Sequence, residues 1–210
     1  MFDLERKVIF IHPPKTGGTT IEAAFGWHPN YHPKDSRKEY TVHFKNFKHA
    51  SLAEHIDAIE RRGLDSREFY KFACIRNPWD VMVSRFFHDR SFVMEKENKK
   101  AEELPLELKY FNIFVLTRLQ DMKKDWLNVE KYFFYKGKYA IDYIIRYEHY
   151  KKDTEKIFSK YGVDWPESSY NANTRPAGYC YRSLYTESRT IKAVEKTAKD
   201  FIDLFNYKFY

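Results

Sequence analysis

A short run of lysine, glycine and threonine near the start of the sequence has the composition of an anion-binding turn. The run is PKTGGTT, residues 14–20, and it follows the apolar segment KVIFIH, residues 7–12. Glycines let backbone N–H groups approach an anion closely, threonines add hydroxyl donors, and a helix that begins at such a turn directs its positive dipole end at the ligand. Lys15 adds a positive charge. The run therefore predicts a phosphate-binding site, with an ordinary strand-to-helix turn as the alternative interpretation.

The order of these residues differs from that of the loop that binds nucleoside triphosphates. That loop reads G-x-x-x-x-G-K-[ST], with its lysine after the last glycine, whereas Lys15 precedes Gly17 and Gly18. No aspartate ends an obvious apolar strand as a magnesium ligand would, although Asp80 after ACIRNPW is a weak candidate. A magnesium-dependent nucleotide kinase with an atypical loop is therefore a disfavoured alternative.

A second segment combines an arginine with a serine after another expected strand-to-helix turn. It reads CIRNPWDVMVSRFF, residues 74–87, with Arg76 leaving the strand and Ser84 inside the helix. If the turn folds back, a guanidinium fork and a hydroxyl can converge on one phosphate. Taken alone, an arginine and a serine at this separation are more often unrelated surface residues, so the position after a second strand and turn is what favours the phosphate site.

Together the two segments resemble a known family, the sulfotransferases that use 3′-phosphoadenosine 5′-phosphosulfate (PAPS), particularly the carbohydrate branch with its bacterial family 2 members. FIHPPKTGGTT is similar to that family's 5′-phosphosulfate loop, and IRNPWDVMVSRF to its 3′-phosphate segment. One departure is Val81, where many relatives have arginine after NPWD. The resemblance implies a P-loop-like sulfotransferase fold and these donor-binding residues: Lys15, Thr16, Gly17, Gly18, Thr19, Thr20, Arg76, Ser84 and Arg182.

The resemblance continues through the rest of the chain, although residues 91–138 match only loosely. KHASLAEHI resembles the family's segment ahead of a helix, and it implies His49 as the general base. His43 and His55 are the rival histidines, whereas His12 is expected to pack in the core or to support the turn. The closing segment, residues 181–209, implies the late nucleotide contact from Arg182.

The reaction implied by the resemblance explains why these residue types are needed. Sulfuryl transfer moves an SO3 unit from a phosphate to an acceptor oxygen or nitrogen, so the leaving phosphate must be stabilised and the acceptor proton accepted. Lys15 suits the first task and His49 the second, because a histidine exchanges protons near neutral pH. PAPS would be the donor, 3′-phosphoadenosine 5′-phosphate (PAP) the product, and no metal is needed.

Strands and helices that would position these residues follow from apolar periodicity and turn residues. The expected strands are 7–12, 69–76 and 139–150, and the expected helices are 19–26, 51–63, 81–93 and 151–162. This recurrence favours an α/β fold with a central, largely parallel sheet flanked by helices, in a single domain spanning 1–210. Such sheets place ligands beyond the carboxyl ends of their strands, so Arg146 reaches the site or pairs with a carboxylate such as Glu148.

Composition indicates the kind of ligand and the cellular compartment to expect. The 37 Lys+Arg against 30 Asp+Glu favour an anionic ligand, and a non-catalytic binder of nucleic acid or another polyanion is the alternative from a different class. Two cysteines indicate neither a disulfide framework nor a cysteine zinc site. With no signal-peptide pattern and no membrane span, a cytoplasmic protein is expected. The expected partner is a small-molecule or glycan acceptor, not nucleic acid; the acceptor itself and the oligomeric state have no readable signal.

Overall fold

The computed structural model describes residues 1–27, 49–97, 108–166 and 180–210. Packing divides the chain into two compact units. Unit 1 comprises Met1–Ile75 and Val129–Tyr170, and unit 2 comprises Arg76–Asn128 and Asn171–Tyr210. The chain passes from the first unit to the second directly after a strand of the central sheet, so the sheet belongs wholly to unit 1.

Unit 1 is built on a four-stranded sheet in the order β1-β2-β3-β6. Its strands are β1 Phe2–Asp3, β2 Val8–Ile11, β3 Tyr70–Ile75 and β6 Tyr143–Arg146. β2, β3 and β6 are parallel, and β1 is an antiparallel edge strand. The prediction of a largely parallel sheet is therefore confirmed. Since Ile75 pairs with Arg146, the carboxyl ends of β3 and β6 lie side by side.

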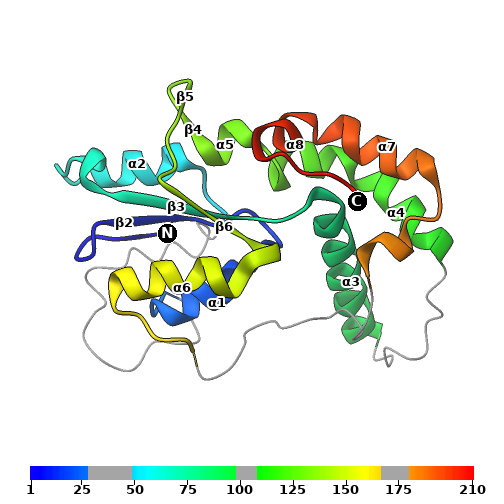
Figure 1. Cartoon of the computed structure of the whole chain (residues 1–210), viewed down its shortest axis with the longest axis horizontal. Helices are drawn as coiled ribbons and strands as arrows, with labels where there is room; N and C mark the ends of the chain where they lie inside the picture. Colours follow the sequence, from blue (N-terminus) through cyan, green and yellow to red (C-terminus); the bar gives the residue numbers. More distant parts are fainter. Residues whose placement is uncertain (28–48, 98–107, 167–179) are drawn as a thin grey trace. The chain divides into compact units, whose positions relative to one another are not determined.

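Helices cover both faces of this sheet. Figure 1 shows α1 (Gly18–Ala24) and α6 (Tyr150–Tyr161) on one face and α2 (Leu52–Glu60) on the other. Successive strand residues point to opposite faces, so all four residues of β2 are buried when helices cover both sides of the sheet. This is the reason why the sequence of β2, VIFI, is apolar throughout. The core between the sheet and α1 and α6 contains these residues: Val8, Phe10, Ile21, Phe25, Trp27, Phe72, Cys74, Ile145, Ile157 and Phe158.

Helix ends follow their local sequence signals. Ser51 accepts from the backbone N–H of Glu54 while Glu54 bonds back to Ser51, a capping box that begins α2. Gly162 ends α6 in the left-handed conformation at φ 60°. Pro78 is the first residue of α3 (Pro78–Glu97), where its missing N–H costs nothing.

The expected strand 139–150 is too long. β6 spans only Tyr143–Arg146, a 3₁₀ turn η6 covers Tyr147–His149, and α6 begins at Tyr150. The neighbouring β3 ends at Ile75, the partner of Arg146, so residues beyond Arg146 have no strand to pair with. The prediction failed because the β-prone residues after Arg146 contain no information about where the neighbouring strand stops.

The remaining elements of unit 1 are short. A 3₁₀ turn η3 covers Ser66–Glu68, and α5 spans Val129–Phe133. β4 (Phe134–Tyr135) and β5 (Lys138–Tyr139) then form a hairpin whose two turn residues, Lys136 and Gly137, both have positive φ. Positive φ at both positions is typical of the tight hairpin turn whose twist matches that of the strands.

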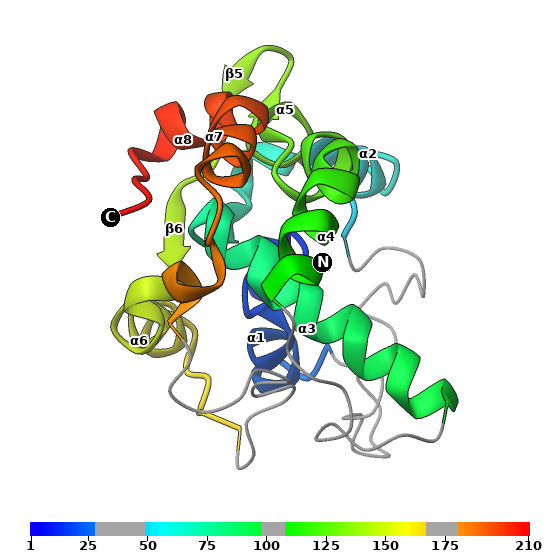
Figure 2. The ribbon, with the colours of Figure 1, turned by 90° about the vertical axis from the view of Figure 1, so that its right-hand side faces the viewer.

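The described part of unit 2 is built from helices. Besides α3 it contains α4 Leu108–Asp121, a π-helical turn η5 Met122–Trp126, a 3₁₀ turn η7 Tyr181–Leu184, α7 Ser188–Thr197 and α8 Lys199–Phe205. α4 packs along α7, and α3 packs against η7 (Figures 1 and 2). Trp79 is buried at the start of α3, where its indole N–H donates to the carbonyl of Ile191 at 3.1 Å and its own carbonyl accepts from the Tyr185 hydroxyl at 3.0 Å.

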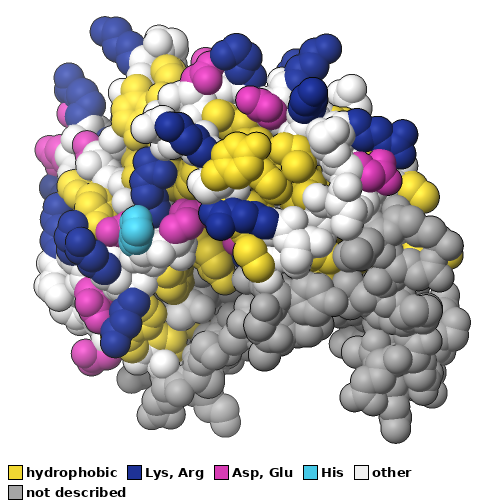
Figure 3. Space-filling view, turned by 45° about the vertical axis from the view of Figure 1, so that its right-hand side comes forward, with side chains coloured by type: hydrophobic (Ala, Val, Ile, Leu, Met, Phe, Trp, Pro, Cys, Tyr) yellow, Lys and Arg dark blue, Asp and Glu magenta, His cyan; other side chains and the backbone are white. Residues whose placement is uncertain are grey.

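The described surface has a mixed charge. On the face shown in Figure 3, Lys and Arg side chains are interspersed with Asp, Glu and hydrophobic side chains. Among the described residues, Lys199 pairs with Asp203 and Arg67 pairs with Asp65. In the part of the chain that the structure describes, no helix has both the length and the apolar character needed to cross a membrane.

Candidate functional site

The loop between β2 and α1 turns sharply because of its prolines and its left-handed residues. Pro13 and Pro14 stop the strand, Lys15 has φ 65° and Gly17 has φ 88° before α1 begins. A lysine with positive φ is held there by its surroundings, since this conformation costs about 1 kcal/mol or more for a non-glycine residue. Strain of this kind gathers at ligand-binding loops. Lys15 itself is half-buried, at the carboxyl end of the sheet.

The threonines of the loop have different tasks. Thr16 is fully buried, and its hydroxyl donates to the carbonyl of Pro13 at 2.7 Å. That hydroxyl therefore closes the turn. Thr19 and Thr20 are half-buried in the first turn of α1, where the backbone N–H groups lack partners within the helix.

Both glycines of the loop lie against aromatic side chains. A Cβ on Gly18 would lie 2.4 Å from a ring carbon of His12, and one on Gly17 would lie 3.1 Å from the rings of Tyr147 and Tyr150. The sequence indicated close approach of the backbone to a ligand as the reason for these glycines. The structure shows a second reason, which is that side chains of the protein itself lie where a Cβ would be.

Gly18→Ala is therefore expected to lower the free energy of unfolding by about 1–3 kcal/mol, because the methyl group overlaps the His12 ring. Denaturant titration measures this loss. The same substitution in a His12→Ala background is the control: there the added methyl group should cost much less. An equal cost in both backgrounds would show that the ring contact is not the cause.

Below the loop, His12 and Glu22 form a buried pair. His12 Nδ1 lies 2.5 Å from Oε1 of Glu22, and neither side chain is more than 3% exposed. His12 ends the apolar strand and Glu22 lies in α1, so the pair links strand, loop and helix. His12 is buried, in agreement with the prediction that it packs in the core or supports the turn, whereas Glu22 was missed. The available signal was an acidic residue within the otherwise apolar run IEAAF, residues 21–25.

His49 lies beside the start of the loop. Its Nδ1 is 2.7 Å from the carbonyl oxygen of His12, and the two imidazole rings meet edge to face with centroids 4.9 Å apart. A carbonyl oxygen only accepts, so Nδ1 has the proton and Nε2 of the neutral ring has a lone pair. His49 is half-buried. The arrangement is suited to a base that acts through Nε2.

The rival histidines differ in setting. His55 is 1% exposed in α2, its Nε2 lies 2.9 Å from the amino nitrogen of Met1, and burial holds its pKa well below the usual value. A ring so enclosed is a core residue. His43 lies outside the described residues.

In unit 2, Arg76 precedes α3, and Asp80 and Ser84 follow within it at intervals of four residues. Nε of Arg76 donates to Oδ2 of Asp80 at 2.8 Å, and both side chains are buried. Ser84 is half-buried one helical turn after Asp80 in α3, which places it on the same side of the helix. The bond orients the guanidinium and occupies the carboxylate that the sequence marked as a weak magnesium candidate.

The start of α3 is also bonded to the late segment of the chain. Asn77 accepts from the backbone N–H of Trp79 at 3.1 Å, and its amide donates to the carbonyl of Lys208 at 2.9 Å. The same amide lies 3.4 Å from the hydroxyl of Tyr181. Nε of the exposed Arg182 donates to the carbonyl of Phe209 at 3.0 Å. The structure thus brings Arg182 to the same end of α3 as Arg76. The linking role of Asn77 was not predicted from the sequence.

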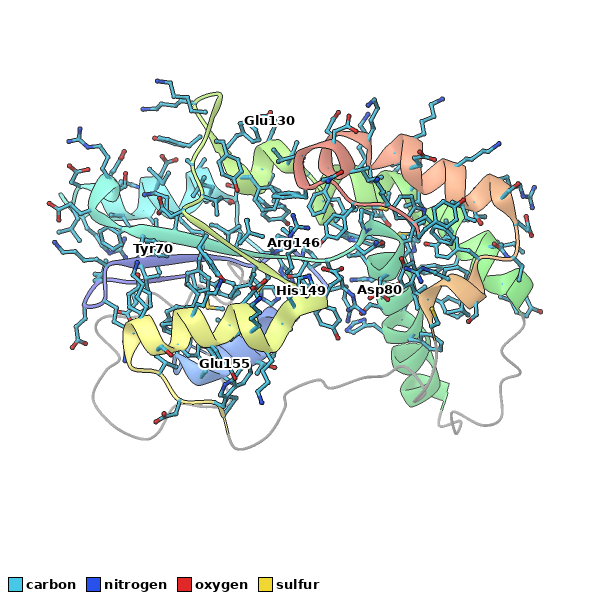
Figure 4. All side chains as sticks on the ribbon, viewed as in Figure 1. Tyr70, Asp80, Glu130, Arg146, His149 and Glu155 are labelled. Atoms are coloured by element: carbon cyan, nitrogen blue, oxygen red, sulfur yellow. The ribbon has the colours of Figure 1, made fainter. Side chains whose placement is uncertain are left out.

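The carboxyl end of β6 lies beside that of β3, at the edge of the sheet where the loop begins. Figure 4 labels Arg146 at this end and His149 where α6 begins. The backbone N–H of Arg146 donates to Asp153 Oδ2 at 3.1 Å, which ties the end of the strand to the first turn of α6. The predicted site residues therefore form two groups. Unit 1 holds the loop with His49, and unit 2 holds Arg76, Ser84 and Arg182.

Comparison with known proteins agrees with these observations. A family model described as Sulfotransferase family matches residues 1–203, which includes the loop, His49, Arg76, Ser84 and Arg182. No curated protein and no solved structure shows significant similarity to the chain. Because the family match spans almost the whole sequence, the protein belongs to the sulfotransferase family and is a transferase of sulfuryl groups.

Proposed function

We propose that the protein transfers a sulfuryl group from PAPS to an acceptor hydroxyl, with a carbohydrate as the acceptor class and residues 1–210 acting as one P-loop-like sulfotransferase domain. The observation with the most weight is the hydrogen bond from His49 to the carbonyl of His12. It holds a histidine with an accepting Nε2 next to a loop of backbone donors and a lysine. The carbohydrate acceptor rests on the resemblance of the two phosphate segments to carbohydrate sulfotransferases.

Each residue of the loop group has a defined task in this reaction. Nε2 of His49 accepts the proton of the acceptor hydroxyl as the acceptor oxygen forms its bond to sulfur. Lys15 and the backbone N–H groups at the start of α1 stabilise the negative charge on the phosphate oxygen as its bond to sulfur breaks. When bound, PAPS would supply the sulfuryl group, which passes to the acceptor oxygen as an SO3 unit without net charge.

Arg76, Ser84 and Arg182 would bind the 3′-phosphate, the group that distinguishes PAP from ATP. The bond from Nε of Arg76 to Asp80 fixes the guanidinium plane, and a fixed planar fork binds a phosphate with less loss of entropy than a mobile lysine. Bonding of Arg182 to Phe209 has the same orienting effect.

Calorimetric titration with PAP and ATP, with and without magnesium, tests this assignment. We expect PAP to bind without magnesium and more tightly than ATP. Arg76→Ala should weaken PAP binding about 10- to 100-fold, because it removes a charged hydrogen-bonding partner. Arg189→Ala is the matched control, since Arg189 is exposed in the same unit and bonds to Glu187. Equal affinity for both nucleotides, or unchanged PAP binding by Arg76→Ala, contradicts the assignment.

The same titration separates the two alternatives. A kinase would bind ATP in a magnesium-dependent manner, and Asp80, its candidate ligand, is already bonded to Arg76. A non-catalytic polyanion binder would show salt-sensitive binding that is indifferent to Lys15.

A further inference from the structure

Two tyrosines from the turn after β6 lie against the phosphate loop. The rings of Tyr147 and Tyr150 are the nearest groups that a Cβ on Gly17 would meet, each at 3.1 Å. Tyr147 belongs to η6, and Tyr150 is the first residue of α6, directly after the labelled His149 in Figure 4. Their ring centroids are 5.9 Å apart. These two side chains therefore bring a segment 130 residues away in the sequence onto the loop.

The Tyr150 hydroxyl makes a specific bond there. It donates to the carbonyl oxygen of Gly17 at 2.8 Å. Burial raises the pKa of this hydroxyl far above its usual value, and a bond with Thr20 is a smaller, opposing influence. The hydroxyl therefore keeps its proton at neutral pH and can donate it to the carbonyl of Gly17.

That bond determines the direction of the next N–H group. In a trans peptide the C=O of one residue and the N–H of the next point in opposite directions. Gly17 at φ 88° followed by Gly18 is a pair with no Cβ to restrict rotation of the peptide between them. With the Gly17 carbonyl held by Tyr150, the N–H of Gly18 points away from α6, and as the first residue of α1 it has no partner within the helix.

We propose that Tyr150 is a positioning residue of the donor site: by holding the carbonyl of Gly17, it points the Gly18 N–H at the 5′-phosphate. This inference rests on the proposed function, because it takes the phosphate of PAP or PAPS as the acceptor of that N–H. A side chain at residue 17 or 18 would restrict the backbone of the loop, but the close contacts with His12, Tyr147 and Tyr150 leave little room for one. The bond from Tyr150 supplies this restriction instead.

Tyr150→Phe tests the proposal, because it removes the hydroxyl and keeps the ring that packs on Gly17. Two measurements on the full chain are needed: PAP affinity by calorimetry, and the change in the Gly18 amide ¹H shift on PAP binding by NMR. We expect PAP affinity to fall about tenfold, as for the loss of one oriented donor, and the downfield shift of the Gly18 amide to shrink. Tyr161→Phe is the matched control, at the other end of the same helix, and should change neither.

The outcomes separate this inference from the proposed function. If the wild type does not bind PAP, the proposed function fails and the inference fails with it. If the wild type binds PAP and Tyr150→Phe binds it equally, with the same Gly18 shift, the proposed function stands and the role of Tyr150 is overturned. A loss of thermal stability in Tyr150→Phe with an unchanged Gly18 shift identifies a purely structural contact and also overturns it.

Discussion

His49→Ala is expected to lower kcat of sulfuryl transfer by about 10²- to 10⁴-fold, the range found when a general base is removed. Nδ1 of His49 donates to the His12 carbonyl, so the proton-accepting nitrogen of the neutral ring is Nε2. The alanine variant retains the capping box at Ser51 and the buried residues of α2, so the fold should be kept. Single-turnover kinetics with the identified acceptor measures the loss, and calorimetry should give near-normal PAP affinity.

The open choice among the histidines is decided by the same assay. His43→Ala is the comparison variant, and we expect it to retain most of the activity. A near-normal rate for His49→Ala together with a large loss for His43→Ala would transfer the role of base. His55 is a poor comparison, because its ring is buried against Met1 and Phe2 and its loss would disturb the core.

Lys15→Ala is expected to lower kcat by about 10²- to 10³-fold, the effect of removing one stabiliser of developing charge. KM for PAPS should change less than kcat, because the charge that Lys15 meets grows as the bond to sulfur breaks. Alanine keeps a Cβ at the left-handed position of φ 65°, so the backbone strain of the loop is unchanged. The measurement is steady-state kinetics over a range of PAPS concentrations.

The matched control for Lys15 is Lys136→Ala. Lys136 also has positive φ, 49°, and it lies exposed in the β4–β5 turn. Both substitutions therefore remove one charge at a left-handed residue, and only the loop variant should lose activity. An equal, small loss of activity in both variants would indicate an effect of net charge. A higher KM with an unchanged kcat in Lys15→Ala would assign Lys15 to ground-state binding.

Much of the secondary structure was predictable because its signals are local. Pro78 at the start of α3, Ser51 with Glu54 at the start of α2 and Gly162 after α6 all act within one helical turn of their own position. The predicted strand 139–150 runs four residues past Arg146, because the end of the strand depends on where β3 ends.

The candidate site divides in the same way. By itself the sequence determined the composition of the loop, the order of its lysine and glycines, and the likeness of two segments to the phosphate sites of one family. Only the tertiary structure decided that the Thr16 hydroxyl closes the turn, that His49 bonds to His12, and that Tyr150 holds Gly17. The bonds of His49 and Tyr150 join residues 37 and 133 positions apart. Composition and spacing specify what each residue can do, but a bond between distant residues exists only once the packed sheet has brought its strand ends together.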